Sequence, residues 1–270
     1  MPYVEVEPGV RIFVEDLNPA GEQTVLFIHG WPANHKMFEY QFNQLPKYGI
    51  RCIAIDIRGF GKSDKPWEGY CYDNLADDLN CVIETLDLDN IMLVGFSVGG
   101  AIAVRYMSRY SGYGISKLAL VSAAVPVFTQ RPDYPYSLPV AEVNKLICQT
   151  YTDRPKMLSE FGKKFFANNV SPQFLNWFGS LGLEAAGHAT ASLAKSLRDE
   201  DLRRDIPQIS VPTTIFHATH DQIVAFANAE ITHQNISNSR LIPFEFSGHG
   251  LVSDESDKFN YCLTQFLCSS

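Results

Sequence analysis

Short, uninterrupted apolar runs recur along the sequence, at residues 24–28, 52–55, 91–94, 118–121 and 213–216. Runs of this length without polar alternation are typical of strands buried on both faces of a parallel sheet. The start of the chain differs, because residues 3–7 and 10–15 alternate apolar and polar side chains around Pro8 and Gly9. That alternation predicts an N-terminal β-hairpin with one face more exposed to solvent than the other.

Helical periodicity separates the apolar runs. Residues 73–86 place leucine, valine and isoleucine at three- and four-residue spacings, which predicts a surface helix. Residues 98–110 begin with small and apolar side chains, as expected of a helix packed close under a sheet. The repeated alternation of strand and helix predicts an α/β fold with a mostly parallel sheet. With the opening hairpin and a further run at 241–244, we expect eight strands.

The alternation of predicted strands and helices stops after Val121 and resumes near Val211. The sequence between them begins with a proline-rich turn region and then carries helical patterns, which we place at residues 141–150, 155–166, 172–183 and 186–197. We therefore predict a catalytic core formed by residues 1–123 and 206–270. The helical cap, residues 124–205, is inserted after the sixth strand.

Composition narrows the class of protein. The 270 residues are 46% hydrophobic and 19% charged, which is ordinary for a folded globular chain. A formal net charge of −8, with no dense Lys/Arg cluster, argues against binding to nucleic acid or to anionic membranes. Because the sequence shows neither a signal peptide nor a long apolar segment, we expect a cytoplasmic protein.

No pattern in the sequence indicates a metal or a cofactor. Six cysteines are scattered without a Cys-x-x-Cys pair or metal-ligand spacing, so we expect reduced thiols and no bound metal. The loop at 56–63 lacks the glycine that a Walker motif needs at Asp56 and the one that a dinucleotide motif needs at Asp64. We interpret Asp56 and Arg58 as structural residues.

The strand expected at 91–94 is followed at once by the sequence GFSVGG, residues 95–100, and then by a helix. A serine between small residues in a strand–turn–helix context is typical of a nucleophile elbow, whose tight turn strains the serine backbone. We therefore predict that Ser97 is a nucleophile. The backbone N–H of Val98, at the start of the helix, would then face an oxyanion. The alternative for an isolated motif of this kind is a chance match.

A serine hydroxyl needs a histidine base and a carboxylate that orients the base. His249 lies in a small-residue loop after the run at 241–244, and Asp221 directly follows the run at 213–216. The carboxyl ends of parallel strands meet at one edge of a sheet, so we predict that both residues reach Ser97. The alternatives are a surface histidine and an aspartate that only caps the next helix.

The sequence HGWP at 29–32 follows the first buried strand, where a second oxyanion donor is expected. We assign that donor to the backbone N–H of Trp31. His29 is the competing candidate for a base, and we interpret it as an imidazole that ties loops together. The predicted triad then runs Ser97, Asp221, His249 along the chain, an order that distinguishes one serine-triad fold from two others.

Together these motifs resemble the α/β-hydrolase superfamily over essentially the whole chain. The resemblance rests on HGWP, on the pattern D-x-R-G-x-G-x-S at 56–63, on GFSVGG, and on Asp221 and His249. Within the superfamily the chain looks like the branch of cofactor-free haloperoxidases, perhydrolases and aryl esterases, which implies ester hydrolysis without metal or haem. Members of that branch usually have Phe where Trp31 stands and Met where Val98 stands, so we do not predict perhydrolysis as the main activity.

We therefore predict a carboxylesterase-like serine hydrolase that cleaves small ester or lactone substrates through an acyl-enzyme on Ser97 and uses no cofactor. The cap would supply an apolar pocket, and core packing is an equal alternative for each candidate wall: Phe128, Tyr134, Trp177 and Phe178. Two other functions stay open. The same triad would serve a C–C bond hydrolase, perhydrolase or lyase, and the scaffold would also serve a non-enzymatic ligand receptor. The sequence leaves the natural substrate and the oligomeric state open.

Overall fold

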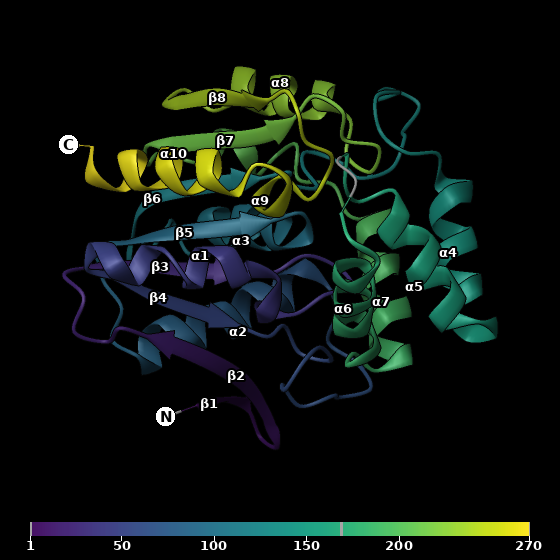
Figure 1. Cartoon of the computed structure of the whole chain (residues 1–270), viewed down its shortest axis with the longest axis horizontal. Coiled ribbons are helices and arrows are strands. Elements are labelled where there is room, and N and C mark those ends of the chain that lie inside the picture. The colour runs from purple at the N-terminus through teal and green to yellow at the C-terminus, as the bar shows by residue number, and fades with distance from the viewer. Residues whose placement is uncertain (1, 168–169, 270) are drawn as a thin grey trace.

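The computed structural model describes residues 2–167 and 170–269. Within these residues, eight strands form one sheet in the order β1-β2-β4-β3-β5-β6-β7-β8 (Figure 1). β2 pairs antiparallel with β1 and β4, and every other neighbouring pair is parallel, which confirms the predicted mostly parallel sheet. The strands are β1 (Tyr3–Glu7), β2 (Val10–Leu17), β3 (Gln23–Ile28), β4 (Ile50–Ile55), β5 (Ile91–Phe96), β6 (Ile115–Val121), β7 (Thr213–Ala218) and β8 (Ser239–Phe244).

The central strands β3 and β5 are buried on both faces, as their apolar runs predict. All residues of β5 are buried, and so are residues 25–28 of β3. The register pairs Ile28 of β3 with Gly95 of β5, and Phe96 of β5 with Val121 of β6. The carboxyl ends of these strands therefore meet at one edge of the sheet, where the loops that follow them come together.

Helices cover both faces of the sheet (Figure 1). On the face toward the viewer lie α1 (Glu39–Phe42), α9 (Leu251–Asp254) and α10 (Ser256–Cys268). Behind the sheet lie α2 (Tyr72–Thr85), α3 (Val98–Arg109) and α8 (Phe226–Asn235). The short 3₁₀ helices are η1 (His35–Phe38), η2 (Leu45–Tyr48) and η3 (Ile206–Gln208). In residues 2–167 and 170–269, no helix is both long and apolar enough to span a membrane.

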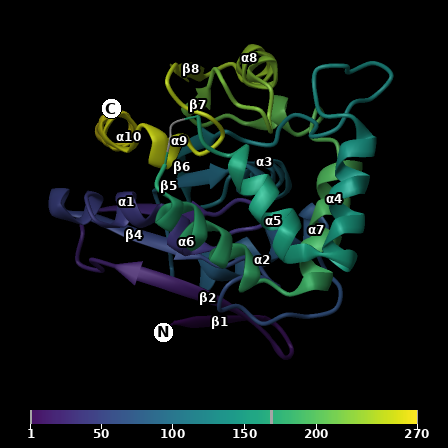
Figure 2. The same ribbon diagram turned by 45° about the vertical axis from the view of Figure 1, so that its right-hand side comes forward.

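The described residues between β6 and β7 form the predicted helical cap (Figures 1 and 2). Its helices are α4 (Val140–Thr152), α5 (Arg154–Lys163), α6 (Pro172–Leu183) and α7 (Gly187–Asp199). They lie together beyond the carboxyl ends of the parallel strands. Apolar side chains of the cap, such as Leu158 and Phe178, belong to the same buried cluster as the strands. The division of the chain at residues 124 and 205 stays a prediction.

α5 ends at Lys163, although the sequence pattern predicts a helix as far as residue 166. The chain leaves the helix here because its backbone bonds to a distant loop. The carbonyl oxygen of Phe165 accepts the N–H of Gly250 at 2.8 Å, and the N–H of Ala167 donates to the carboxylate of Asp254 at 2.9 Å. These bonds join the cap to Gly250, in the segment between β8 and α9, and to Asp254 at the end of α9.

Candidate active site

Ser97 occupies the sharp turn between β5 and α3. Its backbone has φ 53° and ψ −117°, a conformation that a residue other than glycine keeps only when the surrounding structure holds it. The surroundings do hold it: the N–H of Ser97 donates to Val121 O at 2.9 Å, and the N–H of Ala124 donates to Ser97 O at 2.9 Å. The end of β6 and the loop that follows it therefore fix the serine, which is 5% exposed, at the edge of the sheet.

Gly99, two residues after Ser97, lies against the end of β3. A Cβ atom at this position would lie 2.3 Å from the carbonyl oxygen of Ile28 and 2.7 Å from that of His29. The loop after β3 also lies close to the serine: a Cβ atom on Gly30 would be 3.1 Å from the Cβ of Ser97. The predicted nucleophile and the predicted oxyanion loop are neighbours.

Asp221 and His249, from the loops after β7 and β8, are bonded to each other. Nδ1 of His249 lies 2.7 Å from Oδ2 of Asp221, and both side chains are fully buried. The other carboxylate oxygen accepts the backbone N–H groups of Ile223 and Val224 at 2.8 and 2.9 Å. His217 adds an imidazole nitrogen 3.5 Å from Oδ2. These contacts hold the aspartate in one orientation.

The charge state of Asp221 follows from these contacts. Burial would raise the pKa of its carboxyl group, but the charge and hydrogen bond of His249, with smaller contributions from His217 and the Val224 N–H, hold the pKa below its ordinary value. Burial lowers the pKa of His217, whose Nε2 lies 2.9 Å from Val224 O and therefore carries the proton. Asp221 is an anion beside a neutral His217. It does not cap the next helix, since α8 has Ala225 as its N-cap residue.

The imidazole of His249 is packed between aromatic rings. The ring of Phe165 meets it at a centroid distance of 4.9 Å and an angle of 90°, and the ring of Phe96 meets it at 5.1 Å and 64°. Within the described part of the chain, Nε2 of His249 has no hydrogen-bond partner. Because Phe96 directly precedes Ser97, the ring contact places the imidazole at the serine's end of β5.

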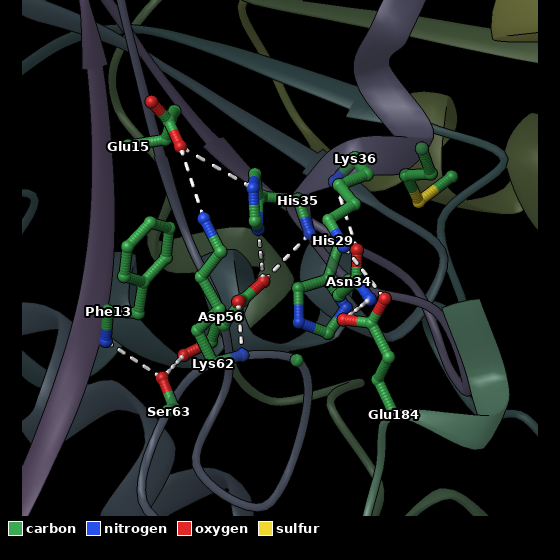
Figure 3. Close-up of polar contacts among 12 residues, drawn as sticks. Phe13, Glu15, His29, Asn34, His35, Lys36, Asp56, Lys62, Ser63 and Glu184 are labelled. Atoms are coloured by element: carbon green, nitrogen blue, oxygen red, sulfur yellow. Dashed lines mark hydrogen bonds and ion pairs between the residues drawn. The ribbon is translucent and has the colours of Figure 1, made fainter. Parts of the chain in front are cut away.

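His29 is the first residue of the predicted oxyanion loop, and it ties two loops together, in agreement with its interpretation from the sequence. Its Nε2 accepts the N–H of Ile57 and its Nδ1–H donates to Gly30 O, both at 3.0 Å. Burial lowers the pKa of His29 to about 4. Nearby, the carboxylate of Asp56 accepts the N–H and the Nδ1–H of His35, each at 2.8 Å (Figure 3). These residues support the loop, and His249 stays as the candidate base.

Trp31 and Val98, the two predicted oxyanion donors, come from different elements. Val98 is the first residue of α3. The side chain of Trp31 reaches into the cap, where its indole Nε1 donates to Thr190 O of α7 at 2.9 Å. Its ring also meets that of Phe161 of α5 at 5.1 Å. The loop beside the serine is therefore attached to the cap.

Phe178, one of the predicted pocket walls, joins an aromatic cluster over the candidate base. Its ring lies 4.6 Å from that of Phe165, which contacts His249. Neither Phe165 nor Phe161 was predicted as a site residue. The available signal was the density of phenylalanine at the end of α5 and in the residues after it.

The other three predicted walls have different surroundings, although Trp177 joins the same aromatic cluster through Phe174 and Phe166. Tyr134 donates its hydroxyl to Asn228 of α8 at 2.8 Å. The ring of Trp177 lies 5.3 Å from that of Phe174, on the same helix. Phe128 is buried in the segment before α4. A role for these three aromatic side chains in substrate binding stays a prediction.

Two of the crevices that open on the cap lie beside α5. One of about 120 Å³ lies between α4, α5 and the loop that carries Asp221, and its lining includes Phe161, Gln222 and Ile223. The other, of about 320 Å³, lies between α5 and α6, and no member of the candidate triad lines it. No triad residue lines the smaller crevice either, but it borders Gln222 and Ile223, which directly follow Asp221.

The sequence profile described as the alpha/beta hydrolase fold matches residues 23–256. The chain is an α/β hydrolase. It is 48% identical to the AB hydrolase superfamily protein YisY of Bacillus subtilis (strain 168), with 98% of each chain covered. The esterase EaEST from Exiguobacterium antarcticum has a similar structure, with a TM-score of 0.96, 46% identity and 99% of both chains covered. The bifunctional esterase/perhydrolase DCH of Acinetobacter calcoaceticus is 30% identical, with 100% of each chain covered.

These relatives confirm the superfamily and the branch that the motifs predict. Membership of this branch of the α/β hydrolases makes the chain an enzyme, so the alternative of a non-enzymatic receptor is not supported. The family also explains why residues from three separate loops gather at one edge of the sheet. In this fold the nucleophile, acid and base follow different strands in chain order.

Proposed function

We propose that this α/β hydrolase is a carboxylesterase-like enzyme that cleaves small ester or lactone substrates through an acyl-enzyme on Ser97. His249 is the general base and Asp221 orients it. The observation that carries the proposal is the buried Asp221–His249 hydrogen bond, at the edge of the sheet where Ser97 sits in its left-handed turn. The relatives named esterase and esterase/perhydrolase support the choice of esters as substrates.

In the acylation step, Nε2 of His249 takes the proton of Ser97 while Oγ attacks the carbonyl carbon of the ester. The negative charge moves to the carbonyl oxygen, where the backbone N–H groups of Trp31 and Val98 stabilise it. When the C–O bond to the alcohol breaks, the imidazolium returns its proton to the leaving oxygen. The alcohol departs and the acyl group stays on Ser97.

Deacylation repeats the proton transfers with water. His249 takes a proton from water as the water oxygen attacks the acyl carbon, and Ser97 regains its proton as the acid leaves. The buried anion of Asp221 stabilises the imidazolium in both steps, and its bond to Nδ1 fixes the tautomer that leaves Nε2 free to accept a proton. Because Ser97 is 5% exposed, the reacting group must fit beneath the cap.

The test is hydrolysis of p-nitrophenyl acetate by the native enzyme and by Ser97→Ala, with early time points that resolve a burst. We expect a burst from the native enzyme and a loss of about 10⁴-fold or more in kcat for the variant, since the acyl-enzyme cannot form. Ser159→Ala, at an exposed serine of α5, is the matched control and should keep native kinetics.

Two results would contradict parts of this proposal. A burst that survives in Ser97→Ala would remove Ser97 as the nucleophile. A folded native enzyme that turns over neither short-chain esters nor lactones would remove the substrate class.

A further inference from the structure

The loop between β3 and η1, residues 29–34, is attached to the cap at its far end. Asn34 is fully buried there, and its Oδ1 accepts the N–H of Lys36 at 3.1 Å. Its Nδ2 donates to Leu181 O at 3.3 Å. The same nitrogen donates to Oε2 of Glu184 at 3.1 Å (Figure 3). The other carboxylate oxygen of Glu184 lies 2.7 Å from Nζ of Lys36. One oxygen of this cap carboxylate therefore binds the loop, and the other binds η1 directly after it.

Glu184 is itself held at a defined place. It directly follows α6 as the C-cap residue. Nη1 of Arg154, from the first turn of α5, donates to Gly182 O at 3.1 Å and to Ala185 O at 2.9 Å, on the two sides of Glu184. The backbone that carries the carboxylate is thus fixed to a neighbouring cap helix, and Glu184 is a firm support for the loop.

We propose that Glu184 is a positioning residue for the oxyanion hole, because it holds residues 29–34, and with them the Trp31 amide, beside Ser97. This inference rests on the proposed function, since it needs Trp31 as an oxyanion donor. The indole bond from Trp31 to Thr190 ties the same loop to α7. The loop is consequently attached to the cap at both Trp31 and Asn34, and the position of the cap sets the geometry of the oxyanion hole.

The hydrogen bond to Asn34 contributes more than the ion pair to Lys36. The Lys36 and Glu184 side chains are 38% and 35% exposed, and an ion pair this exposed contributes little. Asn34 has no exposed surface, and one of its two amide N–H groups would still bond to Leu181 O after removal of Glu184. The other N–H would be left buried without its acceptor, and the loop must shift to satisfy it. Glutamine offers an oxygen to Asn34 but no charge to Lys36. Glu184→Gln should therefore retain most of the function that Glu184→Ala loses.

The expected effect is on kcat. An oxyanion donor acts on the transition state and hardly on the bound ester, so its displacement lowers kcat with little change in KM. Complete loss of one donor costs about 10²- to 10³-fold in rate. A donor that is displaced but still present should cost less, and we expect Glu184→Ala to lower kcat about tenfold.

The experiment compares Glu184→Ala, Glu184→Gln and Lys36→Met with the native enzyme on p-nitrophenyl acetate. Glu230→Ala, at an exposed carboxylate of α8, is the control. Phenylboronic acid is the second probe, because its boron binds Ser97 Oγ as a tetrahedral adduct whose oxygen occupies the oxyanion hole, as a transition-state analogue does. Thermal melts and circular dichroism establish that each variant is folded.

We expect Glu184→Ala to lose about tenfold in kcat and a similar factor in affinity for phenylboronic acid, with KM within about twofold of native. Glu184→Gln and Glu230→Ala should stay within about twofold of native kcat. Lys36→Met should lose less than Glu184→Ala, since it removes only the exposed ion pair.

Each other outcome is informative. A folded Glu184→Ala with native kcat and native boronic acid affinity overturns the proposal and leaves ester hydrolysis intact. A raised KM with unchanged kcat also overturns it, because Glu184 would then act on substrate entry. If Glu184→Gln is as impaired as Glu184→Ala, the effect does not pass through Asn34 and the proposed route is wrong. A native enzyme without ester turnover contradicts the proposed function itself.

Discussion

The buried imidazole of His29 should make the protein less stable in mild acid. Its two ring nitrogens are both engaged at 3.0 Å, Nε2 as acceptor from Ile57 N–H and Nδ1–H as donor to Gly30 O. This pattern requires the neutral ring, since a proton on Nε2 would meet the Ile57 N–H. Burial is the main cause that lowers the pKa of His29 from 6.5 to about 4.

The size of the effect follows from that pKa difference. The unfolded chain binds a proton on His29 below a pH of about 6.5, and the folded protein binds it only below about pH 4. Between these values the unfolded state holds more protons, so stability falls as the pH falls. With about 1.36 kcal/mol per pKa unit, the two titrations give a loss of about 2.5 kcal/mol between pH ~7.5 and pH ~4.5.

His29→Gln is the matched perturbation, because a glutamine side chain also offers an oxygen to Ile57 N–H and an N–H to Gly30 O but does not titrate. Urea unfolding of both proteins at pH ~7.5 and pH ~4.5 gives four free energies of unfolding. We expect the native protein to lose about 2.5 kcal/mol more on acidification than the His29→Gln protein, since the contributions of all other groups cancel in the difference. Equal losses would refute the assignment of this pH dependence to His29.

Two further predictions concern the triad and the turn. Asp221→Asn should lower kcat about 10⁴-fold with a small change in KM, because an amide does not hold His249 in the required tautomer. Steady-state hydrolysis of p-nitrophenyl acetate measures this loss. A loss below tenfold would exclude Asp221 as the residue that orients the base. Gly99→Ala should lower the free energy of unfolding by about 1–3 kcal/mol, because its Cβ would lie 2.3 Å from Ile28 O. Gly179→Ala is the control in urea unfolding, since a Cβ atom there has open space and alanine favours the helix. An equal loss of unfolding free energy in both variants would contradict the steric argument.

The elements that carry the candidate triad were predictable because their signals are local. A buried strand of a parallel sheet is a short apolar run, and Ser97, Asp221 and His249 each follow such a run directly. Parallel strands then bring the three loops to one edge whatever the length of chain between them. The order of residues along the chain was therefore enough to predict which side chains gather there.

The parts of the site that were not predictable depend on contacts between distant segments. The hydrogen bond between Asn34 and Glu184 spans 150 positions, and neither residue stands in a pattern that points to the other. The early end of α5 has the same kind of cause, since Phe165 O bonds to Gly250 N of a loop near the C-terminus. Helical periodicity measures only the preference of the local segment, so it extends the helix past the residue where a tertiary bond ends it.

The segment after α5 has a consequence for protein engineering. Phe165 contributes a ring and a carbonyl oxygen to the loop of the candidate base, and the N–H groups of Ala167 and Gly248 both donate to the carboxylate of Asp254 at 2.9 Å. A chimaera that receives the cap of another hydrolase would lose the contacts of Phe165 and Ala167 together with the original helices, whereas the Gly248–Asp254 bond lies within the core. An exchange of the cap to change specificity should therefore keep residues 165–167 of this chain. Otherwise the cap should come from a hydrolase whose own residues support the histidine loop in the same way.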